Sequence, residues 1–307
     1  MLVRLGFGLG LFFGSLLLGW FLNRQGLLTD ARATRIIRFV VRRLTPAVLA
    51  LSFWRLDLRQ PGLWVLPLIG CLISASTLLP AWGYARAAKL RGPQAGSVLI
   101  CAFFSNLGFF GAFVAFALFG EQAYGLATWY LVYFSPCFYS LGFAIAKRFG
   151  SAATASPMAE GGPDELRFFP FLGMGAGLVL NLLSIPRPAA CETLNHLLIP
   201  VDTALYIMAI GSQMSLRVPR RWLRACVAMS VIKFWWSPLV GWGLVQLWHL
   251  EGLPRLVVLV QAATPVGVSP LMLALLFGLD RRLTNALQVF TALLAIPWML
   301  LYLPLLR

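Results

Sequence analysis

Long apolar runs alternate with short polar breaks along most of the chain. The breaks hold charged residues or clusters of glycine and proline, and the runs approach the roughly 20 residues that a helix needs to cross a bilayer. This pattern predicts an all-α integral membrane protein. Ten membrane-spanning helices are predicted, over residues 5–22, 36–53, 63–82, 97–119, 123–146, 168–183, 197–214, 225–248, 256–277 and 283–305.

The composition supports the membrane interpretation. Of the 307 residues, 60% are hydrophobic and 11% are charged, whereas soluble domains average about 45–50% apolar and about 25% charged residues. Because this apolar surplus has to face lipid, a soluble enzyme, a nucleic-acid-binding protein and a disulfide-stapled secreted domain are all disfavoured. The five cysteines form no C-x-x-C pair, so neither a metal site nor a bound cofactor is predicted.

The net charge of +15 is interpreted as a sign of membrane orientation. With the N-terminus outside, fifteen lysines and arginines fall in the inside loops and six in the outside segments, as the positive-inside rule requires. Both termini are therefore expected to face outside, in a plasma membrane or bacterial inner membrane. Arg35, Arg38 and Arg42 recur at helical spacing in the second span, where they are expected to form one wet face that reaches the lipid headgroups.

The two halves of the chain share the positions of their prolines and glycines. Pro80 and Pro238 lie 158 residues apart, and the same offset separates the Leu-Phe-Gly sequences that end at Gly120 and Gly278. Because five spans is an odd number, a second copy has to insert upside down, as in many secondary transporters. The alternative is that proline and glycine merely punctuate membrane helices, where both are common. The predicted parts are two five-helix repeats, residues 1–149 and 168–307, and a cytoplasmic linker, residues 150–167.

Glycine and proline interrupt the fourth and ninth spans near their middles. The fourth contains SNLGFFG from Ser105 to Gly111, and the ninth contains TPVGVSP from Thr264 to Pro270. Such breaks free backbone groups at bilayer depth, where they must face protein or a watery cavity. The N-terminus of a half-helix then favours an anion such as a carboxylate. The predicted substrate site comprises Asn106, Gly108, Gly111, Thr264, Pro265, Gly267, Ser269 and Pro270.

Short motifs along nearly the whole chain resemble the auxin efflux carrier family, which includes plant auxin exporters and bacterial malate/malonate-type permeases. They lie at residues 19–28 (GWFLNRQGLL), 45–47 (TPA), 106–111 (N-x-G-x-x-G), 233–238 (a lysine before a proline), 262–265 (AATP) and 277–280 (FGLD). The resemblance implies ten spans, outside termini, crossing fourth and ninth helices, elevator-like export of organic anions and a homodimer.

The chain departs from that family pattern in two places. Members with a characterised carboxylate site tend to have an asparagine in both crossing helices, whereas the ninth span here offers Thr264 and Ser269. The central linker is also short, unlike the long loop of plant auxin exporters, so auxin is not the expected substrate. The bile-acid/sodium symporter family shares the architecture and is the neighbouring alternative.

Two ionisable residues fall well inside predicted spans. Asp202 lies in an apolar run of the seventh span, and intramembrane carboxylates usually mark ion paths or proton relays. Lys233 is the mid-span lysine of the eighth span. It could neutralise an anionic substrate, or the two residues could form a structural charge pair. For Asn106 the alternative to a substrate contact is an ordinary interhelical hydrogen bond, and the same interhelical role is favoured for Asn181.

These features together predict a secondary transporter that moves a small organic anion by alternating access. Spans 3–5 and 8–10 would form the moving transport part, and spans 1, 2, 6 and 7 the scaffold. The chain contains no G-x-x-x-x-G-K-[ST] sequence, so a proton or sodium gradient or the substrate's own gradient is expected to drive transport. An intramembrane enzyme is disfavoured because His196 and His249 lie near span ends, without H-E-x-x-H or G-x-S-x-G. A non-transporting sensor would lack an output domain.

Overall fold

The computed structural model describes residues 2–60, 62–151, 164–215 and 218–302. Within these ranges the regular secondary structure is helical, apart from one isolated β-bridge. Most of the predicted linker, residues 152–163, lies outside the described part of the chain. The described residues confirm the prediction of an all-helical protein with apolar helices long enough to cross a membrane.

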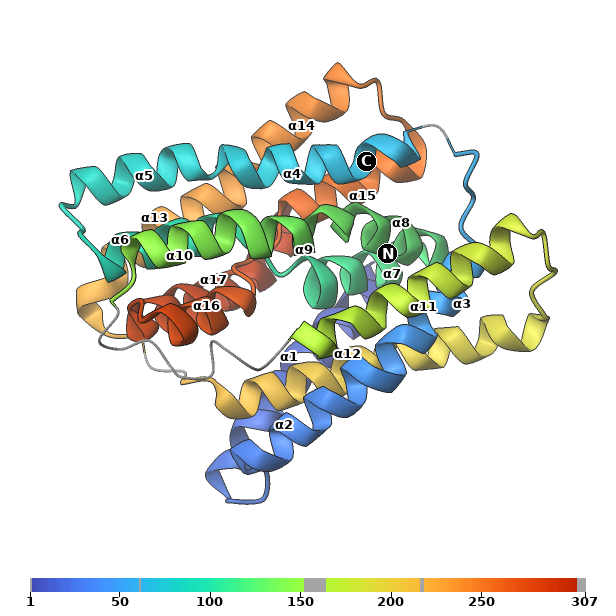
Figure 1. Ribbon diagram of the computed structural model, residues 1–307, viewed down its shortest axis with the longest axis horizontal. Helices are drawn as coiled ribbons and strands as arrows, with labels where there is room; N and C mark the ends of the chain where they lie inside the picture. Colours follow the sequence, from blue (N-terminus) through green and yellow to red (C-terminus); the bar gives the residue numbers. More distant parts are fainter. Residues whose placement is uncertain (1, 61, 152–163, 216–217, 303–307) are drawn as a thin grey trace. The chain divides into compact units, whose positions relative to one another are not determined.

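The helices of the first half follow one another with short connections, apart from the longer segment of residues 55–65 between α3 and α4 (Figure 1). Several are extended by a π-helical turn, which lets a helix continue with one wider turn. In chain order they are α1 (Leu2–Arg24), α2 (Asp30–Phe39) with a π-turn at Val40–Leu44, α3 (Thr45–Trp54), α4 (Leu66–Ser76), α5 (Leu78–Ala87), α6 (Pro93–Phe103), a π-turn at Leu107–Gly111, α7 (Ala112–Phe119), α8 (Glu121–Tyr130), α9 (Phe134–Cys137), a π-turn at Phe138–Gly142 and α10 (Phe143–Phe149).

The second half has a similar series of long helices. In chain order they are α11 (Asp164–Leu182), α12 (Ala189–Gln213), α13 (Leu223–Val231), a π-turn at Ile232–Trp236, α14 (Ser237–Leu247), α15 (Gly252–Ala262), α16 (Ser269–Phe277) and α17 (Arg281–Tyr302).

Within the described part of the chain, six helical segments are long and apolar enough to cross a membrane. They cover Gly6–Arg24, Leu63–Ala87, Glu121–Phe149, Ala189–Gln213, Arg220–Leu247 and Arg281–Tyr302. Shorter apolar helices cover Pro93–Phe103, Leu107–Phe119, Phe168–Leu182 and Gly252–Ala262. The helix formed by α2 and α3 is not among these segments, and its first half carries five arginines.

The chain divides into two compact units, each assembled from both halves of the sequence. Unit 1 contains Met1–Leu63, Gly108–Thr128 and Gly161–Met214, and unit 2 contains Trp64–Leu107, Trp129–Glu160 and Ser215–Arg307. The boundary between Leu107 and Gly108 therefore falls inside the predicted fourth span.

Glycines allow the long helices of unit 1 to pack closely against one another. α1 packs along α12, and α3 packs along α11 (Figure 1). A methyl group at Gly211 of α12 would lie 2.2 Å from the Leu16 carbonyl oxygen, and one at Gly177 of α11 would lie 2.2 Å from that of Ala50. Small residues at such contacts let membrane helices pack backbone to backbone, where apolar lipid supplies little driving force for association.

Unit 2 has a core rich in aromatic and small residues. Phe103, Phe104 and Phe138 are each 1% exposed. The ring of Phe104 meets those of Phe134 and Phe138 edge to face, with centroids 5.2 and 5.5 Å apart. These contacts fix the end of α6, where the helix stops.

Candidate functional site

Two helix breaks meet in unit 2. Helix α6 ends at Phe103 and the next helical residue is Leu107, while α15 ends at Ala262 and α16 begins at Ser269. Between these ends, Ser105 and Val266 form an antiparallel β-bridge. The Asn106 backbone N–H donates to the Pro265 carbonyl at 2.8 Å, and the Gly267 N–H donates to the Phe104 carbonyl at 2.9 Å. The two breaks thus satisfy part of each other's backbone, as apolar surroundings require.

The residue types at the ninth-span break suit this close approach. A Cβ atom at Gly267 would lie 2.7 Å from the Ser105 carbonyl oxygen and 2.9 Å from its carbonyl carbon. Any larger residue there would push the two non-helical segments apart. The Val266 N–H donates to the Thr291 hydroxyl of α17 at 3.2 Å, so a side chain from a third helix also supports the break. Sequence reasoning missed Thr291, because a threonine in an apolar helix gives no distinctive signal.

A buried lysine lies against the same break. Lys233 is fully buried, and its amine donates to the Ala102 carbonyl and, at 2.7 Å, to the Ser105 hydroxyl. Ala102 is in the last turn of α6, so the Lys233 amine lies at the negative end of that helix dipole. The Thr77 hydroxyl of the preceding span lies 2.8 Å from the same carbonyl oxygen. Lys233 was singled out from sequence, whereas Thr77 was not.

The remaining ninth-span residues have distinct surroundings. Thr264 is fully buried, and its hydroxyl donates to the Gln261 carbonyl of its own helix end at 2.8 Å. Ser269 is half-buried at the first position of α16, and Pro270 follows it in the first turn. Val268, the N-cap of α16, makes no side-chain capping hydrogen bond. The start of α16 is therefore the anion-favouring end of a helix that begins beside the paired breaks.

The predicted site residues are divided between the units. Asn106, Thr264, Pro265, Gly267, Ser269 and Pro270 belong to unit 2, whereas Gly108 and Gly111 belong to unit 1. Asp202 is also in unit 1, where it is 1% exposed and accepts a 2.7 Å hydrogen bond from the Thr45 hydroxyl. Asp202 and Lys233 thus lie in different units, and each has polar partners of its own. A direct pair between them stays a prediction.

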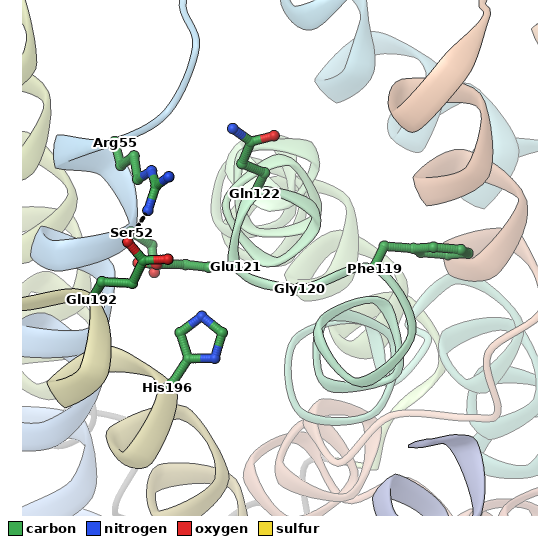
Figure 2. A pocket seen from close by; sticks show the side chains of 8 residues that line it. All are labelled: Ser52, Arg55, Phe119, Gly120, Glu121, Gln122, Glu192 and His196. Carbon is green, nitrogen blue, oxygen red and sulfur yellow. Dashed lines mark hydrogen bonds and ion pairs between the residues drawn. The ribbon is translucent and has the colours of Figure 1, made fainter. Parts of the chain in front are cut away.

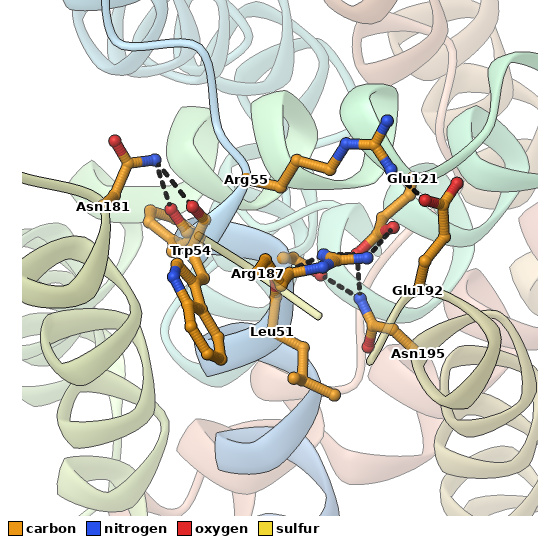
Figure 3. A network of polar contacts seen from close by, with 10 residues as sticks. Leu51, Trp54, Arg55, Glu121, Asn181, Arg187, Glu192 and Asn195 are labelled. Carbon is orange, nitrogen blue, oxygen red and sulfur yellow. Dashed lines mark hydrogen bonds and ion pairs between the residues drawn. The ribbon is translucent and has the colours of Figure 1, made fainter. Parts of the chain in front are cut away.

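Unit 1 contains a polar network that sequence reasoning did not find (Figure 3). Arg187, just before α12, forms a two-pronged ion pair with Glu121 at 2.6 and 2.8 Å, and both side chains are 6% exposed. The amide of Asn195 donates to Glu121 and, at 2.9 Å, to the Ser52 hydroxyl. Hydrogen bonding to the Glu121 carboxylate raises the pKa of Arg187 above its usual value. The network ties the starts of α8 and α12 to the end of α3.

The signals for this network were weak because its members lie at predicted span ends. Glu121 follows Gly120 in a short connection, and Arg187 lies in a predicted outside loop, where an ordinary solvated charge is expected. An acid in the first turn of α8 also fits the helix dipole without any partner.

Asn181, in contrast, was predicted to make an interhelical contact. Its amide lies 2.9, 3.1 and 2.7 Å from the carbonyls of Phe53, Trp54 and Leu56 at the end of α3.

A cavity of about 250 Å³ opens beside this network (Figure 2). It is lined by Ser52, Arg55, Phe119, Gly120, Glu121, Gln122, Glu192 and His196. Ligand atoms of Glu121, Glu192 and His196 lie within 4.8 Å of one another, a set that could hold a metal ion. Both carboxylates are already paired with arginines, Glu121 with Arg187 and Glu192 with Arg55, so a metal ion would have to compete with those cations.

The chain matches a protein family described as "Membrane transport protein" over residues 12–160 and 164–303. An uncharacterized transporter of Methanothermobacter thermautotrophicus is 26% identical over 289 residues, which cover 91% of each chain. An uncharacterized transporter of Methanocaldococcus jannaschii is 27% identical over 202 residues, which cover 64% of this chain and 63% of the relative. These are similarities to transporters rather than to enzymes. Together with its apolar helices, they identify the chain as an integral, multi-pass membrane transporter that belongs to the membrane transport protein family, the auxin efflux carrier family that its motifs resemble.

Proposed function

We propose that this transporter carries a small organic anion whose carboxylate binds at the paired breaks of unit 2. The main support is the reciprocal backbone pairing of Asn106 with Pro265 and of Gly267 with Phe104. It places two helix interruptions in contact, and a break at bilayer depth is the usual location of a transporter's substrate site. The start of α16 would offer backbone N–H groups, and Asn106 an amide, to the carboxylate.

The charge beside the breaks also favours an anion. The Lys233 ammonium donates to a carbonyl and a hydroxyl, and neither acceptor carries a formal charge. A cation held in this way at membrane depth retains its electrostatic attraction for a negative guest. Lys233 would therefore attract the substrate electrostatically, while Asn106 and α16 would set its orientation.

The repeat architecture is proposed to be a 5+5 inverted repeat with crossing fourth and ninth spans. Within unit 1 the first span packs on the seventh, and the sixth packs on the second. In both pairs the first helix of one half packs on the second helix of the other half, as expected for an inverted repeat. The bridge between Ser105 and Val266 is antiparallel and joins one break from each half. Two segments related by an in-plane twofold axis meet in this antiparallel sense.

Transport is proposed to occur by elevator-like movement of the part built around unit 2. Unit 2 contains the third, eighth, ninth and tenth spans, the first half of the fourth and most of the fifth, whereas unit 1 contains the first, second, sixth and seventh. This division supports a scaffold and a transport part. Gly108–Thr128 groups with unit 1, so the moving part would end near Leu107 on that side rather than include the whole of the fourth span.

Coupling to a proton gradient through Asp202 is proposed as the driving step. The carboxyl group is buried and has the Thr45 hydroxyl as a neutral partner, and buried intramembrane acids commonly exchange protons. The alternative is sodium coupling, as in the bile-acid/sodium symporters. Asp202→Asn should abolish accumulation driven by a pH gradient but leave counterflow intact. Undiminished accumulation in that variant, or accumulation that needs a sodium gradient, would contradict proton coupling.

The distribution of lysines and arginines supports an orientation in the membrane. We propose that both termini face outside, in a plasma or bacterial inner membrane. We also propose that two copies form a homodimer, as the family resemblance implies. Labelling of single cysteines placed in the 88–92 connection and in the 183–188 connection would test the orientation. A cysteine in the 88–92 connection should react only from the inside, and one in the 183–188 connection only from the outside.

Counterflow in proteoliposomes tests the substrate class. Proteoliposomes that contain the purified protein and are loaded with unlabelled malonate should exchange it for external radiolabelled malonate or malate in a saturable way. Asn106→Ala should reduce this exchange at least about tenfold, because one hydrogen bond to a charged group is worth roughly 1.5–3 kcal/mol. Asn285→Ala is the matched control, since the Asn285 amide bonds the Ser215 carbonyl in a different part of unit 2. Normal exchange by Asn106→Ala would remove the proposed site.

A further inference from the structure

The helix formed by α2 and its π-turn has two opposite faces. Its inner face, with Ala33 fully buried and Ile36 and Ile37 half-buried, packs against Ala209 and Met208 of α12. Its outer face carries Arg35 and Arg38, which are exposed, and Phe39, which is 54% exposed. Arg43, in the π-turn, is exposed as well.

The arginines of the outer face have few counter-charges within the protein. Among the described residues, Arg35, Arg38 and Arg43 have no ion-pair partner. Asp30 is the one acidic residue in the stretch from position 24 to position 54, and it lies in the first turn of α2. By contrast, Arg55, a little further along the chain, is paired with Glu192.

This basic face runs directly into an apolar helix. α2 continues through the π-turn at Val40–Leu44 into α3, without a loop. α3 has no charged residue from Thr45 to Trp54. In a multi-pass membrane protein, such a change from arginines to apolar residues marks the level of the lipid headgroups. Exposed Phe39 adds apolar surface next to the arginines of the same helix.

We propose that the face formed by Arg35, Arg38, Phe39 and Arg43 is a binding site for an anionic phospholipid. Arg35 and Arg38 are three residues apart, so their guanidinium groups are neighbours on one side of the helix and can grip one phosphate in a two-pronged manner. Arg43 is placed to meet a second phosphate or the glycerol phosphate of the next lipid. Phe39 contacts the upper part of the acyl chains. This site is separate from the proposed substrate site and does not depend on the anion transported.

Native mass spectrometry of the purified full-length protein tests this inference. The protein is mixed with phosphatidylglycerol, cardiolipin or phosphatidylcholine, and the lipid adducts are counted. The wild type should bind both anionic lipids at least about tenfold more tightly than phosphatidylcholine, and about 0.5 M salt should weaken that preference severalfold. Arg35→Gln with Arg38→Gln should lower the affinity for the anionic lipids about fivefold for each arginine removed.

Two further variants separate a specific site from general attraction between charges. Arg281→Gln with Arg282→Gln removes two exposed arginines at the start of α17 and should leave anionic-lipid binding unchanged. Arg35→Lys with Arg38→Lys keeps the charge but loses the two-pronged geometry and should fall between the wild type and the glutamine variant. Equal losses in the α2 and α17 variants, or no loss in the α2 variant, would overturn the proposal.

The fold and a rival occupant can both be checked. Because Arg35 and Arg38 are exposed, the glutamine variant should elute and melt like the wild type in phosphatidylcholine. If the glutamine variant does not fold, two measurements still test the proposal. Salt should weaken the preference of the wild type for anionic lipids, and the single Arg38→Gln variant should bind them more weakly; absence of both effects would overturn it. A second copy of the chain would compete with lipid for this face. Efficient disulfide cross-linking of Arg38→Cys between copies, unaffected by phosphatidylglycerol, would overturn the proposal in favour of that protein interface.

Discussion

Two sites with buried ionisable side chains, the pair of Glu121 and Arg187 in unit 1 and Lys233 in unit 2, differ in the partners that surround them. In unit 1 the Glu121 carboxylate is matched by the Arg187 guanidinium, and Asn195 adds a further hydrogen bond. In unit 2 the Lys233 amine, although fully buried, donates to a carbonyl and a hydroxyl. The first arrangement pairs opposite charges, whereas the second leaves a basic side chain with only neutral partners beside two broken helices.

The contrast separates a structural role from a binding role. A matched buried pair holds elements in register and gains nothing from an added ion. A buried cation with neutral partners gains Coulomb energy when an anion arrives, which is a reason to retain it despite its desolvation cost. The following changes would sharpen or break this distinction.

Removal of one member of the matched pair should cost the most stability. Glu121→Gln leaves the Arg187 charge buried without its carboxylate, and we expect the free energy of unfolding to fall by about 3–5 kcal/mol. Reversible unfolding in mixed micelles measures this. Counterflow by the fraction that remains folded should keep the wild-type KM, because the pair is structural. A raised KM with unchanged stability would assign Glu121 to binding instead.

Removal of the unmatched cation should mainly affect transport. Lys233→Met keeps the length and apolar stem of the side chain but loses the charge, and we expect malonate counterflow to fall about 100-fold, from the loss of one strong charged contact. Stability should change little, because the desolvation cost of the lysine disappears together with its two hydrogen bonds. Lys147→Met, at an exposed position of α10, is the control. A stable variant with normal exchange would contradict the binding role.

A methyl group between the breaks should have an intermediate effect. Gly267→Ala places a Cβ atom 2.7 Å from the Ser105 carbonyl oxygen, so the bridge must widen. We expect a loss of about 1–3 kcal/mol in stability, accompanied by weaker malonate binding. Thermal melting with and without malonate measures both. Gly243→Ala in α14, which would meet no atom within 4 Å, should be neutral, and equal behaviour of the two variants would argue against a tight contact between the breaks.

The exposed ion pair of unit 1 should show the smallest effect. Arg55 and Glu192 are 45% and 48% exposed, and water screens such pairs. Arg55→Gln is therefore expected to change the free energy of unfolding by less than about 1 kcal/mol, measured in the same unfolding experiment as Glu121→Gln. A loss as large as that of Glu121→Gln would show that burial does not distinguish the two pairs.

The helical and membrane character of the chain could be predicted because it depends on local composition. Apolar runs of sufficient length have few alternatives to helix in a bilayer. The segments around Asn106 and Pro265 could also be singled out, since proline and glycine act on their own backbone. Their mutual pairing depends on contacts between residues far apart in the chain, and a single sequence carries no direct record of such contacts.

The unit 1 network shows where sequence reasoning fails. Glu121, Arg187 and Asn195 are ordinary residues at predicted span ends, and only packing brings them together. Lys233 is the intermediate case, because its unusual position was visible whereas its partners, Ala102 and Ser105, were not. Side chains that act through tertiary contacts give weak sequence signals, and residues that change the backbone give strong ones.

Direct binding of an anion to the purified protein is the most decisive measurement. Radiolabelled malonate should bind the wild type saturably in detergent, without any gradient, and unlabelled malate should displace it. Asn106→Ala and Lys233→Met should each raise the dissociation constant at least about tenfold, while Asn285→Ala should leave it unchanged. Equal affinity in all four proteins would contradict an anion site at the paired breaks of unit 2.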